Sequence, residues 1–209
     1  MILDNFIVFE GIDGAGTTTQ LQLLAAQCTP DIVTTTCEPT DGAIGRFIRS
    51  ALAGSLQFDE RTMAYLFAAD RAEHVYGRGG ILAQCAHGKL VVCDRYLFSS
   101  LAYQSLTGDP ALPALLNDPF PLPALLFYFK IDVASALERV ARRGGPKERY
   151  DSSAAQTAVA AAYERVIAEY TGTEKGRGMR VVTIDARERA EKIAQIIWNE
   201  VQNLPILKK

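Results

Sequence analysis

The segment from Gly11 to Thr18 limits the possible folds of this chain more than any other feature. It reads Gly-Ile-Asp-Gly-Ala-Gly-Thr-Thr, follows an apolar run at residues 5–9 and precedes a stretch with helical spacing. The phosphate-binding pattern G-x-x-x-x-G-K-[ST] has the same glycines, which let successive backbone N–H groups face one phosphate. The helix that follows adds the positive end of its dipole. We therefore expect this loop to bind a nucleotide.

One position of the loop departs from the pattern. Thr17 stands where the pattern has lysine, and the first lysine of the chain is Lys89. Thr18 still offers the hydroxyl that binds Mg²⁺ in such loops. Taken alone, the segment could also be a glycine-rich turn without a ligand.

Strand-like and helix-like segments alternate along the 209 residues. Short β-branched or apolar runs predict strands at residues 5–9, 32–36, 89–93, 124–132 and 180–184. Helical spacing is found at residues 18–28, 42–52, 59–86 (interrupted near Gly79–Gly80), 134–143, 154–170 and 186–203. Such alternation predicts an α/β fold of three layers, with about five parallel strands and helices on both faces.

The length suits one domain over residues 1–209, and we find no internal repeat or linker. A proline-rich stretch at residues 107–123 is expected to run over the surface. The polar, arginine-rich segment near residues 142–152 lies between two helices and predicts a short mobile lid.

Charge and hydropathy limit the partners. The net charge is −2 and the isoelectric point about 5.8, so no overall basic excess favours a nucleic acid. No apolar run approaches the roughly 20 residues that cross a bilayer, and the first residues lack the pattern of a signal peptide. We expect a cytoplasmic protein with no membrane partner.

Further motifs occur in a fixed order along the chain. They are Glu38-Pro39, Leu66-Phe67-Ala68-Ala69-Asp70-Arg71, Asp94-Arg95-Tyr96 and Ser99-Ser100-Leu101-Ala102-Tyr103-Gln104. Together with the segment from Phe9 to Gly16 and the arginine-rich lid, they resemble thymidylate kinase, from about Phe6 to Trp198. The resemblance implies a P-loop kinase fold and transfer of the γ-phosphate of ATP to dTMP with Mg²⁺. It also implies a homodimer, formed through helices of residues 59–86.

The resemblance assigns roles residue by residue. The implied catalytic residues are Asp13, Asp94, Arg95 and Arg149, and the implied metal ligands are Thr18 and Asp94. ATP would contact Gly11, Ile12, Asp13, Gly14, Ala15, Gly16, Thr17, Thr18, Thr19, Arg142 and Arg143. The acceptor nucleotide would contact Asp13, Glu38, Pro39, Arg49, Phe67, Arg71, Arg95, Ser99, Ser100, Tyr103 and Gln104.

The chemistry of the acceptor residues agrees with these roles. Phe67 and Arg71 are four residues apart, so they share a helix face, where Phe67 can stack on a pyrimidine and Arg71 can donate to its O4 edge. Phe67 could instead belong to the core. By resemblance, Ser100 reads the N3 edge and Tyr103 lies under the deoxyribose, where its bulk excludes a 2′-hydroxyl. Arg49 matches an arginine that reaches the acceptor phosphate, whereas Arg46 stands where the family often has an acidic residue.

The missing lysine leaves several functions open. By resemblance, the arginine that neutralises the phosphates lies either in the phosphate loop or in the lid. Position 15 of the loop is alanine here, so a lid arginine (Arg142, Arg143 or Arg149) would have to supply this charge. The chain could then be an active kinase, a weak kinase, or a protein that binds dTMP or ATP without turnover. A deoxynucleoside kinase is a further alternative, because Glu38 could act as a base.

Overall fold

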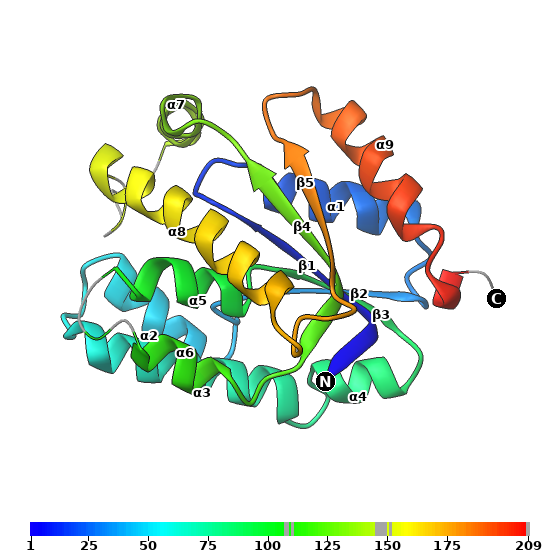
Figure 1. Cartoon of the computed structure of the whole chain (residues 1–209), viewed down its shortest axis with the longest axis horizontal. Coiled ribbons are helices and arrows are strands. Elements are labelled where there is room, and N and C mark those ends of the chain that lie inside the picture. The colour runs from blue at the N-terminus through cyan, green and yellow to red at the C-terminus, as the bar shows by residue number, and fades with distance from the viewer. Residues whose placement is uncertain (107–108, 110, 145–149, 151, 208–209) are drawn as a thin grey trace.

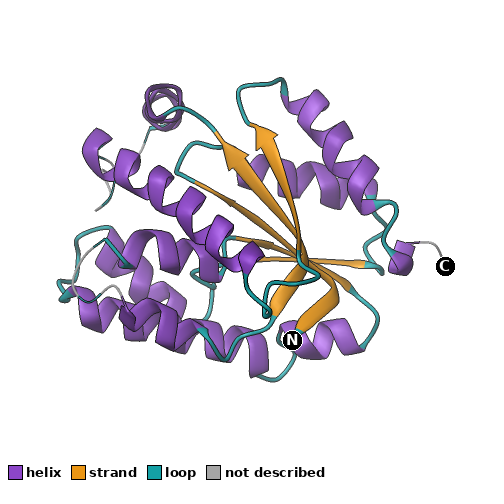
Figure 2. Ribbon diagram, viewed as in Figure 1, coloured by secondary structure: helices purple, strands orange, loops and turns teal. Residues whose placement is uncertain are grey.

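The computed structural model describes residues 1–106, 109, 111–144, 150 and 152–207. Five strands form one sheet: β1 (Ile2–Gly11), β2 (Val33–Cys37), β3 (Leu90–Asp94), β4 (Leu122–Lys130) and β5 (Arg180–Asp185). Their order is β2-β3-β1-β4-β5 and every pairing is parallel. The predicted α/β fold with a five-stranded parallel sheet is thus confirmed, and Figure 2 shows the strands fanning out, as expected for a twisted sheet.

Helices cover both faces of the sheet. They are α1 (Thr17–Gln27), α2 (Ala43–Leu52), α3 (Glu60–Tyr76), α4 (Ile81–Ala86), α5 (Leu97–Gln104), α6 (Ala111–Asn117), α7 (Val133–Arg143), α8 (Ser153–Gly172) and α9 (Ala190–Val201), with a 3₁₀ turn at Pro205–Leu207. In Figure 1, α1 and α9 lie together on one side of the sheet, while α5 and α8 lie together on the other. The core between these layers is built from the strands and the inward faces of the helices, and all five residues of β3 are buried.

Capping side chains explain where several helices begin. The Asp59 carboxylate accepts from the Thr62 N–H (2.8 Å) at the start of α3, and the Asp132 carboxylate accepts from the Ser135 N–H (2.9 Å) at the start of α7. Between α3 and α4, Gly79 has a φ of 78°, a left-handed conformation that favours glycine. This break confirms the predicted interruption near Gly79–Gly80.

Two helices differ from the sequence-based expectation. The sequence pattern predicts no helix over the residues of α5. Helix α6 lies inside the stretch at residues 107–123 that was expected to run over the surface without helical structure. Helix α6 contains a proline, but Pro113 is its third residue, and in the first turn a missing N–H costs no helical hydrogen bond. The helix also buries Asn117, whose amide Nδ2 donates to the Pro113 carbonyl (2.7 Å).

Among the described residues, no helix combines the length and apolar character that a membrane-spanning helix needs.

Candidate active site

The loop between β1 and α1 has the geometry of a phosphate cradle. Gly14 and Gly16 have φ angles of 85° and 92°, in the left-handed region that favours glycine. At Gly14 a Cβ atom would also come within 2.3 Å of the Ala136 carbonyl oxygen, so α7 leaves no room for a side chain there. The loop then runs directly into the first turn of α1, where free backbone N–H groups point outward.

A cavity of about 470 Å³ opens beside this loop. Its lining includes most of the residues expected at the donor nucleotide: Ile12, Asp13, Gly14, Ala15, Gly16, Thr17, Thr18, Thr19 and Arg143. Two others lie elsewhere. Gly11 ends β1 against β4, where a Cβ would come within 2.9 Å of the Phe129 carbonyl oxygen. Arg142 is exposed and pairs with Glu138 one helical turn away (2.8 Å), so its charge does not face the cavity.

Thr18 and Asp94 come together at the edge of this cavity. The Thr18 hydroxyl donates to the Oδ2 atom of Asp94. Within the part of the chain that the structure describes, the Oδ1 atom of Asp94 is buried and has no hydrogen-bond partner. A hydroxyl and a carboxylate with a spare oxygen are ligands suited to Mg²⁺ or its bound waters.

Arg95 follows β3 in an unusual backbone conformation. Its φ of 68° is left-handed, which costs a non-glycine residue roughly 1–2 kcal/mol. The Arg95 N–H donates to the Phe9 carbonyl (2.9 Å), so the turn is held against β1. The Arg95 guanidinium reaches the Oδ1 atom of Asp13 at 2.6 Å. The strained turn thus directs the side chain across the carboxyl ends of β1 and β3, where open parallel sheets bind ligands.

A second cavity, of about 380 Å³, lies on the other side of this ion pair. Every residue expected at the acceptor nucleotide lines it: Asp13, Glu38, Pro39, Arg49, Phe67, Arg71, Arg95, Ser99, Ser100, Tyr103 and Gln104. Asp13 and Arg95 line both cavities. The two cavities therefore meet at the Asp13–Arg95 pair.

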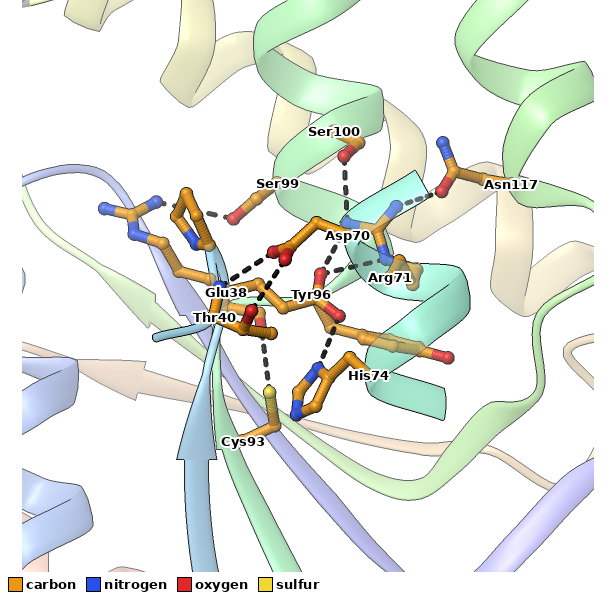
Figure 3. Close-up of polar contacts among 12 residues, drawn as sticks. Glu38, Thr40, Asp70, Arg71, His74, Cys93, Tyr96, Ser99, Ser100 and Asn117 are labelled. Carbon is orange, nitrogen blue, oxygen red and sulfur yellow. Dashed lines mark hydrogen bonds and ion pairs between the residues drawn. The ribbon is translucent and has the colours of Figure 1, made fainter. Parts of the chain in front are cut away.

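The Arg71 side chain is fixed at the inner end of the second cavity. It is only 1% exposed, and its Nε and Nη2 atoms donate to the Oε2 atom of Glu38 at 2.9 and 2.6 Å. Nη2 also donates to the Ser100 hydroxyl (3.0 Å), and Nη1 donates to the Asn117 amide oxygen. Figure 3 shows these partners converging on Arg71 from the segment after β2, from α5 and from α6.

Glu38 is in turn held from its other side. Its Oε1 atom contacts Nδ1 of His74 (2.9 Å), while Nε2 of the same ring lies 2.6 Å from the Thr36 hydroxyl. These contacts leave the Glu38 carboxylate little freedom, and the Glu38–Pro39 peptide bond is cis. Four of the five N–H groups of Arg71 are engaged with Glu38, Ser100 and Asn117, so the guanidinium is fixed in orientation and keeps one Nη1 N–H for a base edge.

The walls of the second cavity are aromatic and partly apolar. Phe67 is half-buried and packs against the small cluster of Ile48, Ala51 and Met63, yet it also lines the cavity. The alternatives of core residue and stacking residue are thus not exclusive. The Tyr103 hydroxyl donates to Asp13 (3.3 Å), and burial raises the pKa of Tyr103, so the phenol stays protonated.

Arginines near the cavities are used differently. Arg49 donates to the Thr40 carbonyl (2.6 Å) and lines the second cavity, whereas Arg46 donates to the Asp41 carbonyl and is exposed. Arg149 and most of the expected lid lie outside the described residues.

Sequence similarity decides the family. The profile of the family described as thymidylate kinase matches residues 9–197. The chain belongs to the thymidylate kinase family. Relatives carrying the thymidylate kinase name include a Treponema pallidum protein, 41% identical over 209 residues and covering 99% of each chain. A Leptospira borgpetersenii relative is 37% identical over 175 residues, covering 79% of this chain and 82% of its own length. A Methanocaldococcus jannaschii relative is 42% identical over 141 residues, covering 67% and 71%.

Two residues at the site of this thymidylate kinase family member were not predicted from the sequence. Arg139 lines the first cavity and donates to the carbonyls of Gly14 (3.4 Å) and Ala186 (2.8 Å). Gln156 donates to Asp13 from α8 (3.1 Å). The helical spacing of α7 and α8 gave no sign of these contacts, which arise only when distant elements pack together.

Proposed function

We propose that the chain transfers the γ-phosphoryl group of ATP to the 5′-phosphate of dTMP, giving ADP and dTDP. The observation that carries this proposal is the shared pair Asp13–Arg95, which lines both cavities. Phosphoryl transfer requires that donor and acceptor be aligned and that the spreading negative charge be stabilised. Nucleotides in the two cavities would bring their phosphates together beside the Arg95 guanidinium, where both requirements are met.

The first cavity would take ATP. Its backbone N–H groups would cradle the phosphates, as the glycine conformations allow. Thr18 and Asp94 would hold Mg²⁺ directly or through water, and the bound ion would neutralise charge on the phosphate oxygens. Asp94 has a free buried oxygen among the described residues, which supports this assignment.

The second cavity would take dTMP. Phe67 would stack on the thymine ring, and Arg71 and Ser100 would face its O4 and N3 edge. Cytosine presents an amino donor in place of O4, so a fixed arginine N–H facing that position would reject it. Tyr103 and Asp13 would lie at the deoxyribose, and Arg49 would approach the acceptor phosphate.

Arg143 is our candidate for the charge that the loop lacks. Thr17 is 8% exposed and uncharged, so it cannot bridge the donor phosphates as lysine does. Arg139 lines the same cavity but is tied to two carbonyls. Arg143 lines the cavity too, and no described residue forms a hydrogen bond or ion pair with it. Arg149 is a second candidate on sequence grounds.

The missing lysine also favours a second function, nucleotide binding with little or no turnover. An assay of dTDP formation from ATP and Mg²⁺ separates these functions, with dTMP, dCMP and thymidine as parallel substrates. We expect dTDP from dTMP and far less product from the others. Tight nucleotide binding without dTDP would establish the binding function, and preferential phosphorylation of thymidine would establish a deoxynucleoside kinase.

We further propose a cytoplasmic homodimer formed through α3. Tyr65 and Tyr76 of this helix are 47% and 51% exposed, and tyrosine is one of the residue types enriched in protein interfaces. Sedimentation equilibrium of the purified chain tests this arrangement, and Tyr65→Glu should shift a dimer towards monomer. A monomeric wild-type chain would overturn it.

A further inference from the structure

Glu10 is a buried carboxyl group directly behind the active-site arginine. It lies near the end of β1, its side chain is 0% exposed, and neither cavity reaches it. Its Oε1 atom accepts from the backbone N–H groups of Tyr96 (2.8 Å) and Ser99 (3.2 Å) at the start of α5. One oxygen therefore already has two donors.

The other oxygen, Oε2, belongs to a triangle of three oxygens. The Ser99 hydroxyl lies 2.6 Å from it and the Tyr163 hydroxyl 3.0 Å from it. The two hydroxyls are themselves only 2.7 Å apart. All three sides of the triangle thus have hydrogen-bond length.

Each side of the triangle needs one proton. Ser99 and Tyr163 each carry a single hydroxyl proton, so together they can fill only two sides. With an ionised Glu10, one side would hold two oxygens in contact with no proton between them. A proton on Oε2 completes the ring: Glu10 donates to Tyr163, Tyr163 donates to Ser99, and Ser99 donates to Glu10.

The ring is connected to the reaction centre through Arg95. The Nη1 atom of Arg95 lies 3.4 Å from the Ser99 hydroxyl oxygen and 3.3 Å from the Tyr163 hydroxyl oxygen. Nη2 of the same guanidinium pairs with Asp13. In the closed ring, Ser99 and Tyr163 each donate their hydroxyl proton to a neighbour in the ring. A lone pair on each hydroxyl oxygen therefore remains to accept a hydrogen bond from Nη1.

We propose that Glu10 carries a proton in the working form of this protein and, through Ser99 and Tyr163, positions the Arg95 guanidinium. Glu10 is then a positioning residue, because it touches neither nucleotide. This role rests on the proposed transfer at Arg95, whereas the protonation of Glu10 itself does not.

The surroundings of Glu10 support its neutral form. Burial raises the pKa of its carboxyl to about 7, against the lowering effects of the Ser99 hydroxyl, the Arg95 charge, the Tyr96 N–H and the Tyr163 hydroxyl. Arg95 is the one charged group among these, and its charge is shared with Asp13. On the side of β4, the Tyr128 ring lies tilted against the Tyr163 ring (5.7 Å between centroids), and this phenol adds no charge because burial raises the pKa of Tyr128 as well.

Ionisation of Glu10 would weaken the interaction of Arg95 with the acceptor phosphate. A buried negative charge behind the guanidinium competes with the acceptor phosphate in front of it. When Glu10 is protonated, the positive charge of Arg95 interacts only with Asp13 and the acceptor phosphate. We therefore expect dTMP binding to favour the protonated form and to weaken as Glu10 ionises.

Two measurements test this proposal. The first is a ¹³C NMR titration of the free protein labelled at glutamate side-chain carboxyl carbons, with the Glu10 signal assigned by its loss in Glu10→Gln. We expect a midpoint near 7, and a midpoint near the ordinary value of 4.5 would overturn the proposal. If Glu10→Gln does not fold, infrared spectra of the wild type can replace it. They should show a protonated carboxyl band at pH 6 that is lost at pH 9, and the absence of such a band at pH 6 would equally overturn it.

The second measurement is the dissociation constant of dTMP against pH for the wild type and Glu10→Gln. The glutamine is neutral at every pH, and the ionisation of dTMP itself cancels in the ratio of the two constants. We expect wild-type affinity to fall several-fold relative to Glu10→Gln above pH 7, with Tyr128→Phe behaving as the wild type. A ratio independent of pH would overturn the positioning role. Failure of every variant to bind dTMP would overturn the proposed function instead, while the titration would still test Glu10.

Discussion

The carboxylate of Asp13 and the guanidinium of Arg95 form an ion pair of 2.6 Å at the point where the two cavities meet. They come from different strand ends, 82 residues apart in the chain. Asp13 also accepts from Tyr103 (3.3 Å) and Gln156 (3.1 Å), so one carboxylate gathers groups from the loop, α5 and α8. The arrangement holds a positive charge ready where charge develops during phosphoryl transfer.

Replacing Arg95 should affect turnover more than binding. In Arg95→Ala the transferring group loses a pre-oriented charge, and we expect kcat for dTMP to fall by about 10²–10³-fold. Steady-state kinetics with ATP and dTMP measure this loss. Arg165→Ala, which removes an exposed arginine from α8, is the matched control and should keep wild-type kinetics. An Arg95→Ala enzyme with normal kcat would remove Arg95 from the mechanism.

The buried pair of Glu38 and Arg71 should matter for stability. Glu38→Gln keeps the shape of the side chain but leaves the Arg71 charge, 1% exposed, without its counter-charge. Removing one partner of such a pair costs about 3–5 kcal/mol, which urea unfolding can measure. The exposed pair Lys130–Glu164 offers a control, since Glu164→Gln should cost only about 0–1 kcal/mol. Equal losses in the two variants would contradict the importance of burial.

Arg71 should also decide between pyrimidine bases. Lysine keeps the charge in Arg71→Lys, but it cannot reproduce the fork of donors that reaches Glu38, Ser100 and Asn117 together. We expect the ratio of kcat/KM for dTMP to that for dCMP to fall by at least about tenfold. Because both values come from one preparation, partial unfolding cancels in the ratio. A ratio equal to that of the wild type would show that other groups read the base.

Glu10 should give stability an unusual dependence on pH. The folded pKa of about 7 is above the ordinary value of 4.5, so the folded state binds the extra proton between these values. Stability from this group is therefore complete below about pH 4.5 and is lost as pH rises through about 7. We expect the free energy of unfolding to fall by about 2–3 kcal/mol more in the wild type than in Glu10→Gln over this window. Parallel curves for the two proteins would contradict a raised pKa.

How far the sequence could predict this molecule depends on the range of the interactions. Strand composition and the glycine loop act locally, so the sheet, most of its helices and the family could be predicted from residues such as Gly14, Gly16 and Arg95. Asn117 could not, because it holds Arg71 only after α6 packs beside α3. The same applies to His74 and Gln156, whose partners lie 36 and 143 residues away in the chain. Arg142 was expected at the donor phosphates, but its guanidinium pairs with Glu138 on its own helix.

The cation that replaces the loop lysine can be identified with two variants. If Arg143 already neutralises the donor phosphates, Thr17→Lys adds a redundant charge at a position that is 8% exposed, and kcat should stay unchanged or fall. Arg143→Ala should then lower kcat by about 10²–10³-fold, because a single well-placed cation contributes roughly 3–4 kcal/mol to the transition state. Arg142→Ala is the matched control, since that side chain already pairs with Glu138.

The double variant Thr17→Lys, Arg143→Ala completes this test. A lysine in the loop should restore much of the activity that Arg143→Ala loses, because both cations would act on the same phosphates. Strong stimulation by Thr17→Lys alone would mean that the charge is missing rather than replaced. In that case the wild-type chain would be a weak kinase or a nucleotide-binding protein. Full activity of Arg143→Ala would instead show that Arg143 does not supply the charge. Arg149 would then be the candidate, and Arg149→Ala would test it in the same assay.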